Sequence, residues 1–123
     1  MISTSILGLW IFSSLIYQGH PLPLPNPALK ISYQFDDIGV NTLHYYREGE
    51  KGFCERRAIY EFAGGKLMQQ VVWVHPQNAA GCEQDMDMKL GYRSWTPAWL
   101  EGGKLHLEVQ MGEEHLVYVW EKY

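Results

Sequence analysis

The sequence has little positive charge and no concentrated basic region. Ten Lys and Arg stand against 14 Asp and Glu, which gives a formal net charge of -4 at pH 7. A nucleic-acid-binding domain usually carries a basic patch, whereas the basic residues here are scattered, apart from Arg56 and Arg57. We therefore expect no nucleic-acid partner.

The sequence also lacks an apolar segment long enough to span a membrane. The stretch from Ile6 to Tyr17 is too short for a helical span, and it has neither the basic region nor the small-residue cleavage site of a signal peptide. We interpret it as a buried strand. We expect Met1 to be a start codon that replaces a removed leader peptide.

Helical periodicity is missing as well, whereas strand signals recur about every ten residues. Aromatic residues make up 14% of the chain, and their flat rings pack well on a sheet. Glycine-rich turns separate eight candidate strands, at residues 6–17, 30–36, 41–48, 53–62, 66–75, 88–96, 104–111 and 114–122. The pattern predicts one all-β domain over residues 1–123. Its expected form is an eight-stranded antiparallel up-and-down barrel, because closing the sheet removes both edges.

Two of the connections are not tight turns. Residues 20–27 read HPLPLPNP, an extended proline segment that we expect to stay outside the hydrogen-bond ladder. Residues 76–87 form a polar loop. Counting strand directions places the connections 18–29, 49–52, 76–87 and 112–113 at one rim of the barrel, which predicts an open, covered mouth.

Gly8-Leu9-Trp10 lies in the first strand of this meander. With that topology, the chain resembles the superfamily of lipocalins and fatty-acid-binding proteins (the calycins). The resemblance implies that Gly8 and Trp10 lie at the closed end of the barrel and that the first connection covers the open end.

Hairpin turns set the register and so predict which side chains face inward. Arg56 is expected on the inner face, opposite Tyr45 and Trp73. A buried guanidinium needs partners, so Arg56 is either a structural residue or the anchor of an anionic ligand. The predicted ligand-binding residues are Arg56, Tyr45, Tyr60, Gln69, Trp73 and Tyr118. In the last hairpin, Leu107 should pair with Tyr118 and Leu105 with Trp120.

The two cysteines lack the spacing of a metal or redox motif. The register places Cys54 opposite His75, and a short return of the following loop would bring Cys82 to it. We expect a Cys54–Cys82 disulfide, with two unrelated thiols as the alternative. A disulfide implies an oxidising compartment, so the expected location is periplasmic or extracellular.

Motifs for catalysis or metal binding are absent. Glu83, Asp85 and Asp87 do not match an EF-hand loop, and we expect a solvated acidic loop there. No nucleophile elbow or phosphate loop occurs. We expect a protein that is not an enzyme, without metal or cofactor.

Two functions fit this reasoning. The first is a secreted or periplasmic carrier of a small, largely apolar or amphipathic ligand, which is anionic if Arg56 is the anchor. The second is a protein-binding barrel, such as an inhibitor of a secreted enzyme, that uses its rim loops. The size of an internal cavity distinguishes them, because carrier pockets usually reach a few hundred Å³.

Overall fold

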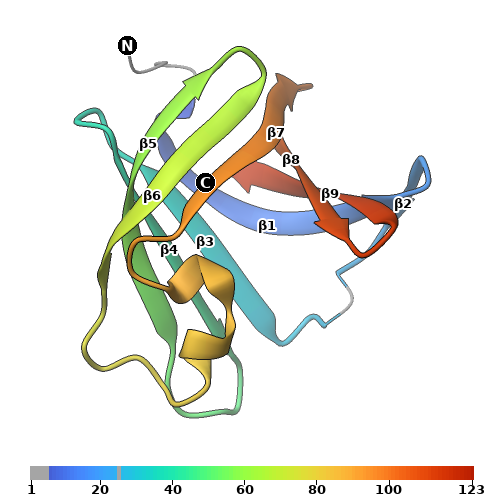
Figure 1. Ribbon diagram of the computed structural model, residues 1–123. Coiled ribbons are helices and arrows are strands. Elements are labelled where there is room, and N and C mark those ends of the chain that lie inside the picture. The colour runs from blue at the N-terminus through green and yellow to red at the C-terminus, as the bar shows by residue number, and fades with distance from the viewer. Residues whose placement is uncertain (1–5, 25) are drawn as a thin grey trace.

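The computed structural model describes residues 6–24 and 26–123. Met1, and Pro25 of the expected proline segment, lie outside this range. Over the described residues the chain forms one antiparallel sheet and two short 3-10 turns (Figure 1). The elements are β1 (Gly8–Tyr17), β2 (His20–Leu22), β3 (Leu29–Phe35), β4 (Val40–Arg47), β5 (Cys54–Ala63), β6 (Lys66–Val74), η2 (Cys82–Gln84), η3 (Met86–Met88), β7 (Arg93–Glu101), β8 (Lys104–Met111) and β9 (Glu114–Lys122).

The predicted closed barrel is confirmed. Consecutive strands from β3 to β9 pair in order, and β1 pairs with both β3 and β9, which closes an eight-stranded antiparallel barrel. A bulge between Phe12 and Ser14 bends β1 as it passes between these partners. No helix among residues 6–24 and 26–123 is long and apolar enough to cross a membrane.

The proline segment does join the ladder, against our expectation. His20–Leu22 forms β2, which pairs with Leu15–Tyr17 of β1. Gln18 and Gly19 both have positive φ, 50° and 79°, as a two-residue turn of type I′ requires. Pro21 is tolerated because β2 is an edge strand, where a missing N–H breaks no ladder.

The sixth barrel strand, β7, lies further along the chain than predicted. The expected strand 88–96 begins in η3, and β7 runs instead from Arg93 to Glu101. Pro97 lies inside this strand. It lies where the pairing of β7 with β6 ends, opposite Lys66, and where pairing with β8 begins at Ala98. The proline can therefore sit inside the strand.

Two predicted registers are wrong. Tyr45 pairs with Cys54, and Arg56 lies opposite Leu43, because the β4–β5 turn is centred one residue earlier than expected. A bulge then shifts β6 by one residue, so that Trp73 pairs with Arg57 rather than with Arg56. The predicted pairs Leu107–Tyr118 and Leu105–Trp120 are confirmed.

Trp10 fills the end of the barrel opposite the long loops. It is 2% exposed, and its Nε1 donates to the carbonyl of Ile6 at 2.9 Å. The ammonium of Lys122 lies 5.5 Å from its ring centroid. Gly8 has φ of 119°, and a Cβ there would lie 3.0 Å from Cε of Lys122. Glycine therefore suits the positive φ at this position and leaves room for the Lys122 side chain, whose ammonium lies over Trp10.

The predicted disulfide is confirmed. Cys54 and Cys82 are bonded, with Cα atoms 5.7 Å apart. The bond ties the loop after β6 to the start of β5. The same loop packs against the β4–β5 turn, where a Cβ on Gly52 would lie 2.9 Å from Cβ of Ala79. This end of the barrel is therefore held by a covalent bond and by close packing.

Candidate functional site

A cavity of about 400 Å³ occupies the barrel at the disulfide-tied end. Strands from opposite walls and the η2–η3 loop contribute to it. Its lining is mostly apolar and aromatic, with a few polar groups, as is common for small-molecule pockets. The lining residues are Leu29, Ile31, Tyr33, Leu43, Tyr45, Arg47, Gln69, Asp85, Asp87, Thr96, Leu107, Val109, Tyr118 and Trp120.

Three predicted ligand-binding residues line this cavity, namely Tyr45, Gln69 and Tyr118. Tyr60 does not. It points toward the closed end, where its hydroxyl donates to the carbonyl of Asp36 at 2.6 Å. Burial and the nearby Asp36 and Asp37 carboxylates raise the pKa of Tyr60 to about 12.

Trp73 is on the outer face of the barrel, so its predicted inward orientation is wrong. The guanidinium of Arg57 lies 4.7 Å from its ring centroid. The bulge in β6 causes this, because one extra residue turns every following side chain to the opposite face.

Arg56 is buried below the cavity, at 1% exposure, and its donors are used by the protein. Nη1 donates to Oδ1 of Asn41, and Nη2 donates to the hydroxyl of Tyr33 at 2.8 Å and to Oε1 of Gln69 at 3.3 Å. Nε donates to the backbone carbonyl of Asp87 at 3.2 Å.

The network closes on itself. Oε1 of Gln69 also accepts from the hydroxyl of Tyr33 and from Nδ2 of Asn41, both at 2.8 Å. Asn41 is fully buried. Burial is the main cause of the raised pKa of Tyr33. Such a satisfied network fixes the positions of its members, and it favours the structural interpretation of Arg56 over that of a ligand anchor.

The acidic loop is not fully solvated, which corrects our expectation. Glu83 is exposed, but Asp85 and Asp87 are half-buried and line the cavity. Asp85 caps η3, with Oδ1 accepting from the backbone N–H of Asp87 at 2.9 Å. Its Oδ2 accepts from the hydroxyl of Tyr45 at 2.7 Å. These contacts hold the loop over the cavity.

Several titratable groups of the cavity are shifted toward their neutral forms. Burial, followed by the neighbouring Asp85 charge, raises the pKa of Asp87, although the Arg56 guanidinium opposes the rise. Burial and the hydrogen bond to Asp85 raise the pKa of Tyr45. Burial and both aspartates raise the pKa of Tyr118. The mouth of the cavity therefore carries a negative potential in a poorly solvated place.

Trp120 belongs to both the core and the cavity. Its ring packs against Phe12 and Tyr33, at centroid distances of 5.4 Å and 5.2 Å. Its buried Nε1 has no hydrogen-bond partner among the described residues. For Trp120 the sequence predicts only its pairing with Leu105. Only the three-dimensional positions of its neighbours show the unpaired donor.

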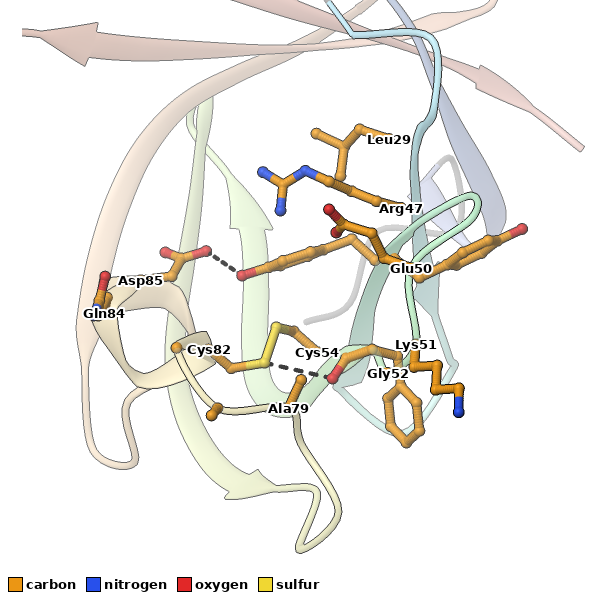
Figure 2. A pocket seen from close by; sticks show the side chains of 15 residues that line it. Leu29, Arg47, Glu50, Lys51, Gly52, Cys54, Ala79, Cys82, Gln84 and Asp85 are labelled. Atoms are coloured by element: carbon orange, nitrogen blue, oxygen red, sulfur yellow. Dashed lines mark hydrogen bonds between the residues drawn. A yellow bond between two sulfur atoms is a disulfide. The ribbon is translucent and has the colours of Figure 1, made fainter.

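A second hollow lies outside the barrel at the same end (Figure 2). This rim cleft has a volume of about 510 Å³ and is formed by residues 50–54, residues 79–85 and the ends of β3 and β4. It shares Leu29, Tyr45, Arg47 and Asp85 with the internal cavity. The Tyr45–Asp85 hydrogen bond thus lies between the two hollows. Among the described residues, no group of three or more His, Cys, Asp or Glu is placed to hold a metal ion.

Comparison with known proteins gives structural matches only. No protein-family model and no curated protein matches the sequence. A lipocalin-like protein from Bacteroides uniformis superposes with a TM-score of 0.63 at 15% identity, covering 97% of this chain and 99% of that one. An uncharacterized protein from Bacteroides eggerthii superposes with a TM-score of 0.56 at 16% identity, covering 95% and 98%. Identities this low show the fold and say nothing of the ligand. The chain therefore has the lipocalin-like barrel fold that the sequence resemblance implied.

Proposed function

We propose that this protein is a binding protein, not an enzyme, that holds a small, largely apolar ligand inside its barrel. The observation that supports this most directly is the cavity of about 400 Å³ at the open end. Pockets for small molecules usually have about 300–1,000 Å³ and a mainly apolar lining. A barrel that served only as a scaffold for its loops would gain stability by filling this space with side chains.

We also propose an extracytoplasmic location, periplasmic or extracellular. The Cys54–Cys82 disulfide supports this location, because structural disulfides persist mainly in oxidising compartments. The disulfide joins the loop that carries Asp85 and Asp87 to the barrel wall. Its loss in a reducing compartment would loosen the cover of the cavity.

Titration of the protein with a neutral apolar dye whose fluorescence rises in apolar surroundings tests the proposal. Val109→Trp should abolish the binding, because Val109 lines the cavity and a larger ring would fill it. Ile59→Trp is the matched control. It adds the same ring on the outer face, where Ile59 is 48% exposed, and should leave the binding unchanged. Equal binding by both variants would place the dye elsewhere and contradict the proposal.

The protein-binding alternative rests on the rim cleft beside the disulfide (Figure 2). Loop-borne clefts are common sites of protein recognition. Native mass spectrometry of protein purified from its own host distinguishes the two functions. A bound small molecule supports the carrier, whereas a bound protein with an empty barrel supports the alternative.

A further inference from the structure

The carboxylate of Asp87 faces an incomplete environment. Asp87 lines the cavity and is half-buried, yet its side chain has no hydrogen-bond or ion-pair partner among the described residues. Arg56 lies close by, but its Nε bonds the backbone carbonyl of Asp87, and its other bonds go to neutral oxygens of Asn41, Tyr33 and Gln69. Its oxygens keep some accessible surface, so a group that enters the cavity can bind them.

A second unpaired group lines the same cavity. Nε1 of Trp120 is buried and has no acceptor in the part of the chain that the structure describes. Buried polar groups are nearly always paired, so an exception calls for an explanation. The two open groups have opposite requirements, because Asp87 needs a hydrogen-bond donor and Trp120 needs an acceptor. A donor on a bound molecule would satisfy Asp87, whereas Nε1 of Trp120 is itself buried and stays unpaired, so that Trp120 offers the ligand its ring.

The remaining charges of the cavity favour a cation near Asp87. Asp85 adds a second carboxylate beside it, held by Tyr45 and by the backbone of Asp87. Arg47 is the cation of the lining, but it is exposed, and water and salt screen an exposed charge. The cation that lies deeper, Arg56, does not line the cavity. Two carboxylates in the lining would therefore repel an anionic ligand, and no buried cation of the lining would attract it.

We propose that the cavity binds an amphipathic amine, whose protonated nitrogen pairs with the Asp87 carboxylate while its apolar or aromatic part lies against Tyr118 and Trp120. This inference rests on the proposed function and names the ligand class of the same cavity. Aromatic faces also attract cations, so Tyr45 and Tyr118 favour the same charge. The volume of about 400 Å³ limits the ligand to a small molecule.

Three probes of equal shape test the charge preference. Phenylbutylamine, phenylbutanol and phenylbutyrate carry the same ring and chain, and they differ in whether the polar end is cationic, neutral or anionic. Titration calorimetry at neutral pH should show the amine binding about tenfold tighter than the alcohol or more, because a charge-assisted hydrogen bond is gained. The carboxylate should bind more weakly than the alcohol.

Two variants locate the effect. Asp87→Asn should reduce the amine affinity about tenfold and leave the alcohol affinity within about twofold. Glu83→Gln removes the same charge from the same loop at an exposed position outside the cavity lining, and it should leave all three affinities nearly unchanged. Equal losses of amine binding in both variants would show a long-range charge effect and overturn the assignment to Asp87.

The outcomes separate this inference from the proposed function. If the alcohol binds and the amine binds no tighter, or the carboxylate binds tightest, the cavity is a ligand site and the amine preference is wrong. If none of the three probes binds wild-type protein, and the neutral dye does not bind either, both proposals fail. The wild-type comparison needs no variant, so misfolding of Asp87→Asn would not leave the inference untested.

Discussion

Replacing Arg56 with methionine tests whether this residue stabilises the fold or anchors a ligand. Methionine has a similar length and no polar donor, so the change leaves the acceptors around it in place. Asn41 is fully buried, and its Oδ1 loses the Nη1 donor, the one partner it has among the described residues. The carbonyl of Asp87 loses Nε. Tyr33 and Gln69 keep their mutual hydrogen bond.

The expected loss follows from these contacts. A buried acceptor without a donor lowers the free energy of unfolding by about 1–3 kcal/mol. We expect the whole of this loss at Asn41, whereas the half-buried carbonyl of Asp87 can bind water instead. Contact of the guanidinium with the Tyr33 ring, at 5.4 Å, is also lost and adds about 0.5–1 kcal/mol. Relief from burying a cation offsets part of this. We expect Arg56→Met to lower the free energy of unfolding by about 2–4 kcal/mol.

Urea denaturation of wild type and variant measures this difference. The double variant Arg56→Met/Asn41→Leu is the matched control, since replacing both partners by apolar groups removes the unpaired acceptor. It should recover about 1 kcal/mol or more relative to the single variant. A loss below about 1 kcal/mol in the single variant would refute the reasoning. A phenylbutyrate affinity that falls in Arg56→Met while stability is kept would restore the anchor hypothesis.

Three further changes have expected outcomes. Cys54→Ala with Cys82→Ala should lower the free energy of unfolding by about 3–4 kcal/mol, because the open chain gains entropy; unchanged urea midpoints would contradict this. Trp10→Ala should cost about 3–5 kcal/mol by opening a cavity, and a loss under about 1 kcal/mol would mean that Trp10 is not the closed-end plug. Because the pKa of Asp87 is raised in the folded protein, ionisation of its carboxyl group lowers the free energy of unfolding as the pH rises through that pKa. In urea titrations, Asp87→Asn should therefore raise the stability at neutral pH and leave the stability at acidic pH unchanged. Equal midpoints at all pH values would exclude this role.

The sequence predicts the barrel because turns and strand alternation are local signals. Gly102 and Gly103, for example, form the turn between β7 and β8. The hairpin of β8 and β9 that follows has the predicted register. The Cys54–Cys82 bond was also accessible, because it depends mainly on which end of the strand each cysteine occupies. These two predictions stay correct even when the assumed strand register is wrong by one residue.

Predictions of which residues pair, or of which face a side chain occupies, become wrong when the register is shifted by one residue. The bulge in β6, whose extra residue is Val72, has no glycine or turn residue beside it that would predict it from the sequence. It nevertheless moves Trp73 from the expected inner face to the outer face. The alternation along β5 itself is intact, so Arg56 is buried as predicted. The error therefore affects the partners of Arg56 and not its own orientation.

The acidic loop shows a different limit. Asp85 and Asp87 lie in a polar stretch between two predicted strands, and polar loops usually face water. Their half-burial follows from the disulfide and from η3, which together fold the loop back over the barrel mouth. A local sequence pattern cannot predict that this loop packs on the barrel. The packing depends on contacts between distant residues, such as the hydrogen bond between Tyr45 and Asp85, 40 residues apart.

The positions of the two buried charges explain why one is satisfied and the other is open. Arg56 projects from β5 into the barrel, where it is 1% exposed, so the fold must supply its partners from other strands. Asp87 lies on a loop at the boundary of the cavity and keeps access to whatever enters it. Substitutions at Arg56 should therefore act mainly by lowering stability, because its hydrogen bonds hold the strands together. Substitutions at Asp87 should act mainly on the charge preference of the cavity while the barrel stays folded.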